Sequence, residues 1–182
     1  MNPYGQPTVR LFNVDFIMNE AKKEEYTLRQ TSQIKFAHIN IIARDFQKLA
    51  DFYNKVFNCE IVSPERNLSG DWLSKGTGVE HAKLKGVHLK LPCCNNNGPT
   101  LEIHQYENIL DNYLAVVNRK GFGHIAFEVE DLISKVNEVV SYGGDKIGEV
   151  SNIQIEGVGI LNFICVTDPE RNIIELQHWD KK

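Results

Sequence analysis

The stretch FAHINI at residues 36–41 returns later in the chain as FGHIAF at residues 122–127. Its histidines, His38 and His124, are 86 residues apart (124 − 38). Asp45 and Asp131, each just before a helical pattern, keep the same spacing (131 − 45 = 86). A fixed offset at two separate anchors indicates an internal repeat, so the chain is predicted to hold two copies of one module.

Each copy is predicted to begin with a strand and a helix. The opening stretches are rich in β-branched and aromatic residues, which favours strands. Asp45 is a typical N-cap for a helix to roughly Asn58, and Asp131 for a second helix that stops at Gly143-Gly144. Each helix carries one apolar stripe, as expected for packing on a sheet. The stripes are Phe46, Leu49, Ala50, Tyr53, Val56 and Phe57, then Leu132, Val136, Val139 and Val140.

Further strand patterns follow each helix. They cover residues 59–63, 84–91 and 100–106 in the first half, and 146–150, 159–167 and 173–179 in the second. The last strands match each other around Glu102 and Glu175, at an offset of 73 (175 − 102). We therefore predict an α+β fold of two βαβββ modules, related by a pseudo-twofold and forming a curved mixed sheet around a metal site.

A chain of 182 residues suits one domain with a substantial core. We predict an N-terminal extension at 1–33 of unassigned role and a domain at 34–182, with modules at 34–107 and 121–180. Residues 64–83 contain Asn67, Ser69-Gly70, Gly76 and Gly78, which are expected to break regular structure, so this segment is predicted to be a lid.

Four residues at equivalent places in the repeat form a candidate metal site. Side chains alternate across a strand, so duplication repeats the direction of each one. A carboxylate inside an apolar strand is costly without a partner, and here two such carboxylates occur together with two equivalent histidines. His38, Glu102, His124 and Glu175 are therefore predicted to bind one divalent ion. Two imidazoles and two carboxylates suit Zn²⁺, Ni²⁺, Co²⁺, Fe²⁺ or Mn²⁺.

The other histidines are interpreted as structural, since an isolated strand histidine is more often a core or surface residue than a ligand. They are His81, His88, His104 and His178. Side chains two residues from a ligand share its strand face and are second-line pocket candidates. These are Asn40, His104 and Gln177.

Composition excludes several classes of function. The net charge is −4 and the chain has no basic stripe, which argues against nucleic-acid binding. No apolar run approaches the roughly 20 residues that span a bilayer, and the N-terminus lacks a secretory pattern, so a cytoplasmic location is expected. Cys59, Cys93, Cys94 and Cys165 are read as free thiols, because no Cys-x-x-Cys pair occurs.

The residues around the four candidates resemble the vicinal oxygen chelate superfamily, which includes glyoxalase I, methylmalonyl-CoA epimerase, extradiol dioxygenases and bleomycin-binding proteins. The resemblance covers about residues 34–179, and the His, Glu, His, Glu set is most similar to glyoxalase I. Two positions depart from the pattern. Ser63 falls near the place of the glutathione-binding arginine, with Arg66 as a neighbour and substrate-binding candidate, and Arg171 replaces a turn glycine.

The resemblance implies metal-assisted proton transfer on a small substrate bound through two oxygens, either a lactoylglutathione lyase-like isomerisation or an epimerisation. Glu175 is then the expected base, and Glu102 returns the proton. A homodimer is the expected assembly. The alternatives are an Fe²⁺ extradiol-type dioxygenase using His38, His124 and Glu175, a non-catalytic ligand-binding or resistance protein, and thiol transfer to an antibiotic.

Overall fold

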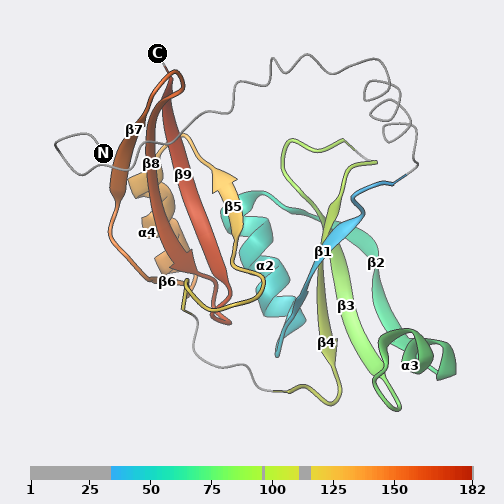
Figure 1. The fold of residues 1–182 in the computed structure, drawn as a ribbon. Coiled ribbons are helices and arrows are strands. Elements are labelled where there is room, and N and C mark those ends of the chain that lie inside the picture. The colour runs from blue at the N-terminus through green and yellow to red at the C-terminus, as the bar shows by residue number, and fades with distance from the viewer. Residues whose placement is uncertain (1–33, 96, 111–115, 182) are drawn as a thin grey trace, which may run out of the picture. The chain divides into compact units, whose positions relative to one another are not determined.

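The computed structural model describes residues 34–95, 97–110 and 116–181 (Figure 1). The predicted extension at 1–33 lies outside the described residues. Residues Ala37–Lys182 form one unit. Within the described ranges no helix is long and apolar enough to cross a membrane.

The first half of this unit forms a sheet with its helices. In chain order the elements are β1 (His38–Ile42), α2 (Phe46–Phe57), β2 (Glu60–Ser69), α3 (Asp71–Thr77), β3 (Lys83–Lys90) and β4 (Thr100–Tyr106). The strand order is β1-β4-β3-β2, here called the first sheet. Strand β1 runs parallel to β4, and the other pairs are antiparallel.

The second half repeats this plan. Its elements are β5 (Ile125–Glu128), α4 (Leu132–Ser141), β6 (Asp145–Lys146), β7 (Ser151–Ile155), β8 (Gly159–Thr167) and β9 (Ile173–Lys181). The order is β5-β9-β8-β6 with β7 paired to β8, here called the second sheet. The mixed α+β class is confirmed. The single strand predicted at 146–150 is wrong, because β6 ends at Lys146 and β7 begins only at Ser151.

The pairing of the strands preserves the repeat. Ile39 lies opposite Leu101 in the first sheet, and Ile125 lies opposite Ile174 in the second. The offsets are 125 − 39 = 86 and 174 − 101 = 73, the same two values that the sequence showed. The two opening strands therefore hold equivalent places beside the two closing strands.

Both predicted helix caps are confirmed. Asp45 Oδ1 accepts a hydrogen bond from Lys48 N at 3.0 Å, and Asp131 Oδ1 accepts one from Ser134 N at 2.9 Å. Each carboxylate thus satisfies a backbone donor that the first helical turn leaves free. Asn58 ends α2 in a left-handed conformation, φ 54°, in which its N–H bonds the carbonyl of Tyr53.

The core lies where α2 packs on the first sheet and α4 on the second. The stripe predicted for α2 is buried throughout. Val140 of α4 is 44% exposed, so its inclusion in the second stripe is wrong; Leu132, Val136 and Val139 form the buried face instead. The two halves meet through stacked rings of Phe57 and Phe127, whose centroids are 4.2 Å apart. In Figure 1, α2 lies between β1 and β5.

The lid predicted at 64–83 is wrong, because this segment folds as part of the first sheet. Strand β2 continues to Ser69 after an irregularity in which the five residues Val62–Arg66 lie along only three residues of β3, Gly86–His88. Helix α3 follows, and its Leu73 is 6% exposed against Ala82 and Leu84. The glycines at 70 and 78 flank this short helix instead of dissolving it. Burial of an apolar patch outweighed the local glycine signal.

Polar contacts also join the two halves. The Glu170 carboxylate accepts hydrogen bonds from Arg44 N at 2.7 Å and Asp45 N at 2.8 Å, at the N-terminus of α2. Tyr53 Oη donates to Asp168 Oδ2 at 3.1 Å in the interior. An anion at a helix N-terminus is favoured by the free amides and the helix dipole. The β8–β9 turn therefore fixes the second half to the helix of the first.

Candidate metal centre

The two strand glutamates point away from the helices. Glu102 stands between Leu101 and Ile103, both fully buried, and Glu175 stands between Ile174 and Leu176, also fully buried. Because neighbours on a strand face opposite sides, both carboxylates lie on the face opposite the core. Their side chains are still only 12% and 21% exposed.

Each glutamate lies beside the candidate histidine of its own half. His38 Nδ1 is 3.4 Å from Glu102 Oε1, and His124 Nε2 is 3.7 Å from Glu175 Oε2. His38 is the first residue of β1, and His124 lies just before β5. Within the described ranges, no group of ligand atoms mutually within 4.8 Å combines the two pairs. That all four residues share one ion stays a prediction.

A tighter group of possible ligands lies on the first sheet alone. The ligand atoms of His88, Glu102 and His104 all lie within 4.8 Å of one another. His88 Nε2 is 3.2 Å from Glu102 Oε1, and His104 Nε2 is 3.8 Å from Glu102 Oε2. Sequence reasoning named His104 as a pocket candidate and missed His88. The sequence predicted that residues 84–91 form a strand, so the side of the strand that His88 faces could be inferred. It did not show that Glu102 lies opposite His88 on the neighbouring strand.

Strand pairing places these three side chains together. His88 lies directly opposite Glu102, and His104, two residues further along β4, lies opposite Gly86. A Cβ atom at position 86 would lie 2.5 Å from His104 Cδ2 and would also overlap the Ile103 carbonyl oxygen. The missing side chain is therefore what lets the His104 imidazole lie over β3.

The environment lowers the pKa of both histidines. For His88 and His104 the main cause is burial, which disfavours the charged ring, and the negative charge of Glu102 opposes it. The positive charge of Arg66 adds to the lowering. Both imidazoles are thus held neutral, which is the form that has a lone pair for a metal ion.

The remaining candidates lie on the same faces. Asn40 Nδ2 is 3.1 Å from His104 Nδ1 and 3.3 Å from the Glu102 backbone oxygen. Arg66 is half-buried on β2, opposite Gly86. Gln177 follows Glu175 by two residues on β9 and shares its face. Asn40 and Arg66 therefore neighbour the first glutamate, and Gln177 neighbours the second.

The residues present fit a divalent ion. His104 Nε2 is buried and has no hydrogen-bond partner among the described residues, although buried polar atoms are normally paired. A metal ion beside Glu102 would satisfy it. Two imidazole nitrogens and a carboxylate are a donor set typical of Zn²⁺, Fe²⁺ and Co²⁺.

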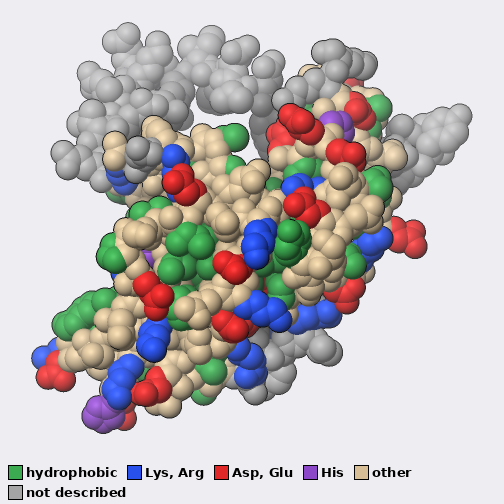
Figure 2. All heavy atoms as spheres, turned by 180° about the vertical axis from the view of Figure 1, so that it is seen from behind, with side chains coloured by type: hydrophobic (Ala, Val, Ile, Leu, Met, Phe, Trp, Pro, Cys, Tyr) green, Lys and Arg blue, Asp and Glu red, His purple; other side chains and the backbone are tan. Residues whose placement is uncertain are grey.

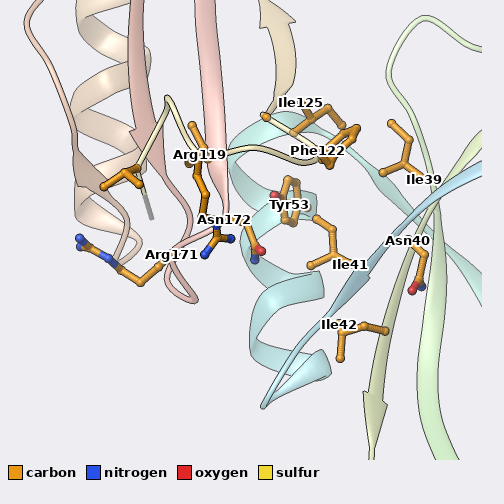
Figure 3. Close-up of a pocket in the computed structure, with 13 residues that line it drawn as sticks. Ile39, Asn40, Ile41, Ile42, Tyr53, Arg119, Phe122, Ile125, Arg171 and Asn172 are labelled. Atoms are coloured by element: carbon orange, nitrogen blue, oxygen red, sulfur yellow. The ribbon is translucent and has the colours of Figure 1, made fainter. Parts of the chain in front are cut away.

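Two cavities lie between the halves. One, of about 240 Å³, lies between β1 and the turn before β9; Tyr53, Ile41 and Asn172 line it, with Phe122 and Ile39 toward its other end (Figure 3). The other, of about 770 Å³, is lined by Cys93, Cys94 and Trp179 among others. Neither is lined by His88, Glu102 or His104. The candidate ligands instead occupy the open face of a sheet.

Figure 2 shows one face of the molecule, on which lysine and arginine side chains alternate with aspartate and glutamate. No continuous basic surface is seen on this face. That distribution agrees with the acidic net charge of −4.

Comparison with known families identifies the class of protein. The model of the Glyoxalase/Bleomycin resistance protein/Dioxygenase superfamily matches residues 35–176. The match covers most of the chain, so the chain belongs to this superfamily, as the resemblance implied. The comparison with curated proteins found no match.

Solved structures support the fold. A glyoxalase family protein from Bacillus cereus is 19% identical, with a TM-score of 0.69 over 82% of this chain and 97% of that one. A glyoxalase I variant from Zea mays is 18% identical, with a TM-score of 0.53 over 79% of this chain and 44% of that one. This chain therefore spans less than half of the maize enzyme. At these low identities, the structural similarity shows that the fold is shared.

Proposed function

We propose that the protein is a glyoxalase-like metalloenzyme that moves a proton within a small substrate bound through two oxygens. The observation that carries the proposal is the repeated pairing of one histidine with one strand glutamate, His38 with Glu102 and His124 with Glu175. Chance burial of a carboxylate in a strand does not explain two equivalent pairs. Membership of a superfamily that includes metalloenzymes such as glyoxalase I supports the same proposal.

The ion, when bound, would stabilise negative charge on a substrate oxygen as the neighbouring carbon loses its proton. Glu175 is the proposed base, because its carboxylate is partly exposed, beside His124, and able to accept a proton from carbon. Glu102 is the proposed group that returns the proton to the adjacent carbon or to the opposite face. Arg66, Asn40 and Gln177 are proposed to orient the substrate.

We further place the complete four-ligand site between two copies of the chain. Each half displays its His-Glu pair on the face opposite its helix, and no group in the described residues combines the pairs. A homodimer that apposes the first sheet of one chain to the second sheet of its partner would bring the pairs together. Such a contact is two-fold symmetric and forms the site twice. A cytoplasmic setting suits the free thiols.

Mixing two inactive variants tests this arrangement. His38→Ala removes the histidine ligand of the first sheet, and His124→Ala removes that of the second sheet. Each homodimer of either variant therefore lacks an intact site. A mixed dimer with sites shared between chains contains one fully native site. We expect activity, measured as solvent deuterium incorporation into a 2-oxoaldehyde thiol adduct, to return on mixing toward about a quarter of the native value. Mixing without any recovery, in samples shown to exchange subunits, would contradict the shared site.

The base role is tested separately. Glu175→Gln preserves shape and removes the proton-accepting charge, so deuterium incorporation should fall at least about 100-fold while the fold is retained. The matched control is Gln177→Ala on the same strand face, for which a smaller loss is expected. Retained exchange in Glu175→Gln would remove this residue from the mechanism, and oxygen uptake with catechols and Fe²⁺ would favour the dioxygenase alternative.

A further inference from the structure

We propose that the first sheet by itself holds a divalent transition-metal ion through His88 Nε2, the Glu102 carboxylate and His104 Nε2. This site rests on the proposed function only in taking the protein to bind a metal. It shares Glu102 with the four-ligand set but uses neither His124 nor Glu175. An ion would thus load onto one module of one chain, before any second sheet approaches.

The distances suit a shared ion. Nitrogen and oxygen ligands bind zinc at about 2.0–2.2 Å, so two ligands at a tetrahedral angle are roughly 3.4 Å apart. His88 Nε2 is 3.2 Å and His104 Nε2 is 3.8 Å from the two oxygens of Glu102. The second distance is too long for a hydrogen bond yet within reach of a bridging cation.

The three ligands are carried on paired strands, which hold them rigidly. His88 on β3 lies directly opposite Glu102 on β4. Glu102 and His104 are two residues apart on β4 and so share one face of the sheet. Gly86 leaves the space that the His104 ring occupies. The orphaned Nε2 atom of His104 is then the ring nitrogen that faces the carboxylate. A site on strands is more precise than one on loops.

Asn40 supplies a partner for the other nitrogen of His104. A metal-bound imidazole normally donates its second N–H to an oxygen. The Asn40 amide is 3.1 Å from His104 Nδ1 with its nitrogen nearest. Turning the amide by 180° presents its oxygen instead, at the loss of the 3.3 Å contact to the Glu102 carbonyl. His38 Nδ1, 3.4 Å from Glu102 Oε1, is positioned to become a further ligand.

Binding of Co²⁺ to the full chain tests the site. The informative variants are His88→Ala and His104→Gln, the second being the residue that the second sheet carries at the equivalent place. Each should weaken Co²⁺ binding, followed by its visible absorption, at least about tenfold. His124→Ala and Glu175→Gln should weaken it less than either of these changes, because the three ligands of the first sheet remain. His81→Asn, at an exposed histidine with φ 52°, is the control for weak surface binding.

A second measurement needs no variant. In NMR spectra of histidine side chains during Zn²⁺ titration, the Nε2 signals of His88 and His104 should shift together, and they should do so at lower Zn²⁺ than the signals of His124. Binding that depends on His124 and Glu175 but not on His88 or His104 would overturn this site and support the four-ligand set. Absence of tight binding in the native chain would overturn both.

Discussion

The two sheets share one plan but surround their central glutamates differently. In the first sheet His88 lies opposite Glu102, and His104 follows on the same strand. In the second sheet Cys165 lies opposite Glu175. The first sheet therefore offers imidazoles where the second offers a thiol and, at Gln177, an amide.

The core sides of the same strands have remained alike. Leu101 and Ile174 are equivalent by register and both are fully buried, as are Leu89 and Val166 across the strand pair. Packing on a helix limits what fits on that side. The opposite face has no such limit, so the two copies of the repeat diverge there. Chemical specialisation is thus expected on the open faces.

The largest loss of stability is expected when the two equivalent core residues, Leu101 and Ile174, are shortened. Leu101→Ala and Ile174→Ala should each lower the free energy of unfolding by about 2–5 kcal/mol, because each leaves a cavity in a fully buried place. Urea unfolding followed by fluorescence and circular dichroism measures this. Coincident transitions would show that the halves unfold as one unit; separate transitions in either variant would contradict the single core.

The next effect concerns the glycine that makes room for His104. Gly86→Ala should lower stability by about 1–3 kcal/mol, since the new Cβ overlaps the neighbouring strand. It should also weaken Co²⁺ binding, because the imidazole is displaced. The register-equivalent change in the second sheet, Phe163→Ala, should leave Co²⁺ binding as it is. Equal loss of Co²⁺ from both variants would mean that the sheets do not differ in metal binding.

A smaller gain is expected in the loops that enter the closing strands. Arg171, before β9, has φ 73°, and Cys93, before β4, has φ 62°. The arginine at the turn position where the resemblance implies glycine therefore has a positive φ. Arg171→Gly and Cys93→Gly should each raise stability by about 1 kcal/mol, and the exposed pair of Arg171 with Asp145 contributes little. Thermal unfolding measures the gain, and a lower melting temperature would contradict it.

The smallest expected effect is a change in how the free energy of unfolding depends on pH, and it arises at Asp168, where the two halves meet. Burial raises the pKa of Asp168 above its usual 3.8, against the lowering effect of hydrogen bonds from Asn172, Glu170 and Tyr53. The folded state therefore holds this proton more tightly than the unfolded state. Its contribution to stability is full below about pH 4 and is lost as the pH rises through the folded pKa.

Asp168→Asn removes this titration. The stability of the native protein relative to the variant should thus fall from pH 4 toward pH 7, as measured by urea unfolding at several pH values. A difference between native protein and Asp168→Asn that does not vary with pH would rule out the assigned cause.

Much of the fold was predictable because its signals are local. The caps at Asp45 and Asp131, the stripe of α2 and the strand at residues 100–106 depend on spacing along the chain, and the structure shows them where predicted. The lid failed because glycines at 70 and 78 were weighed without the apolar patch that Leu73 buries. Local breaking signals are outweighed by tertiary burial.

The sequence alone determined the repeat, its two offsets and the equivalent places of two histidines and two glutamates, because these follow from strand alternation and from spacing along the chain. Only the tertiary structure decided which side chains lie across from one another. Lateral strand pairing brings His88 to Glu102 and His104 over Gly86, and that register depends on the packing of whole sheets against α2 and α4.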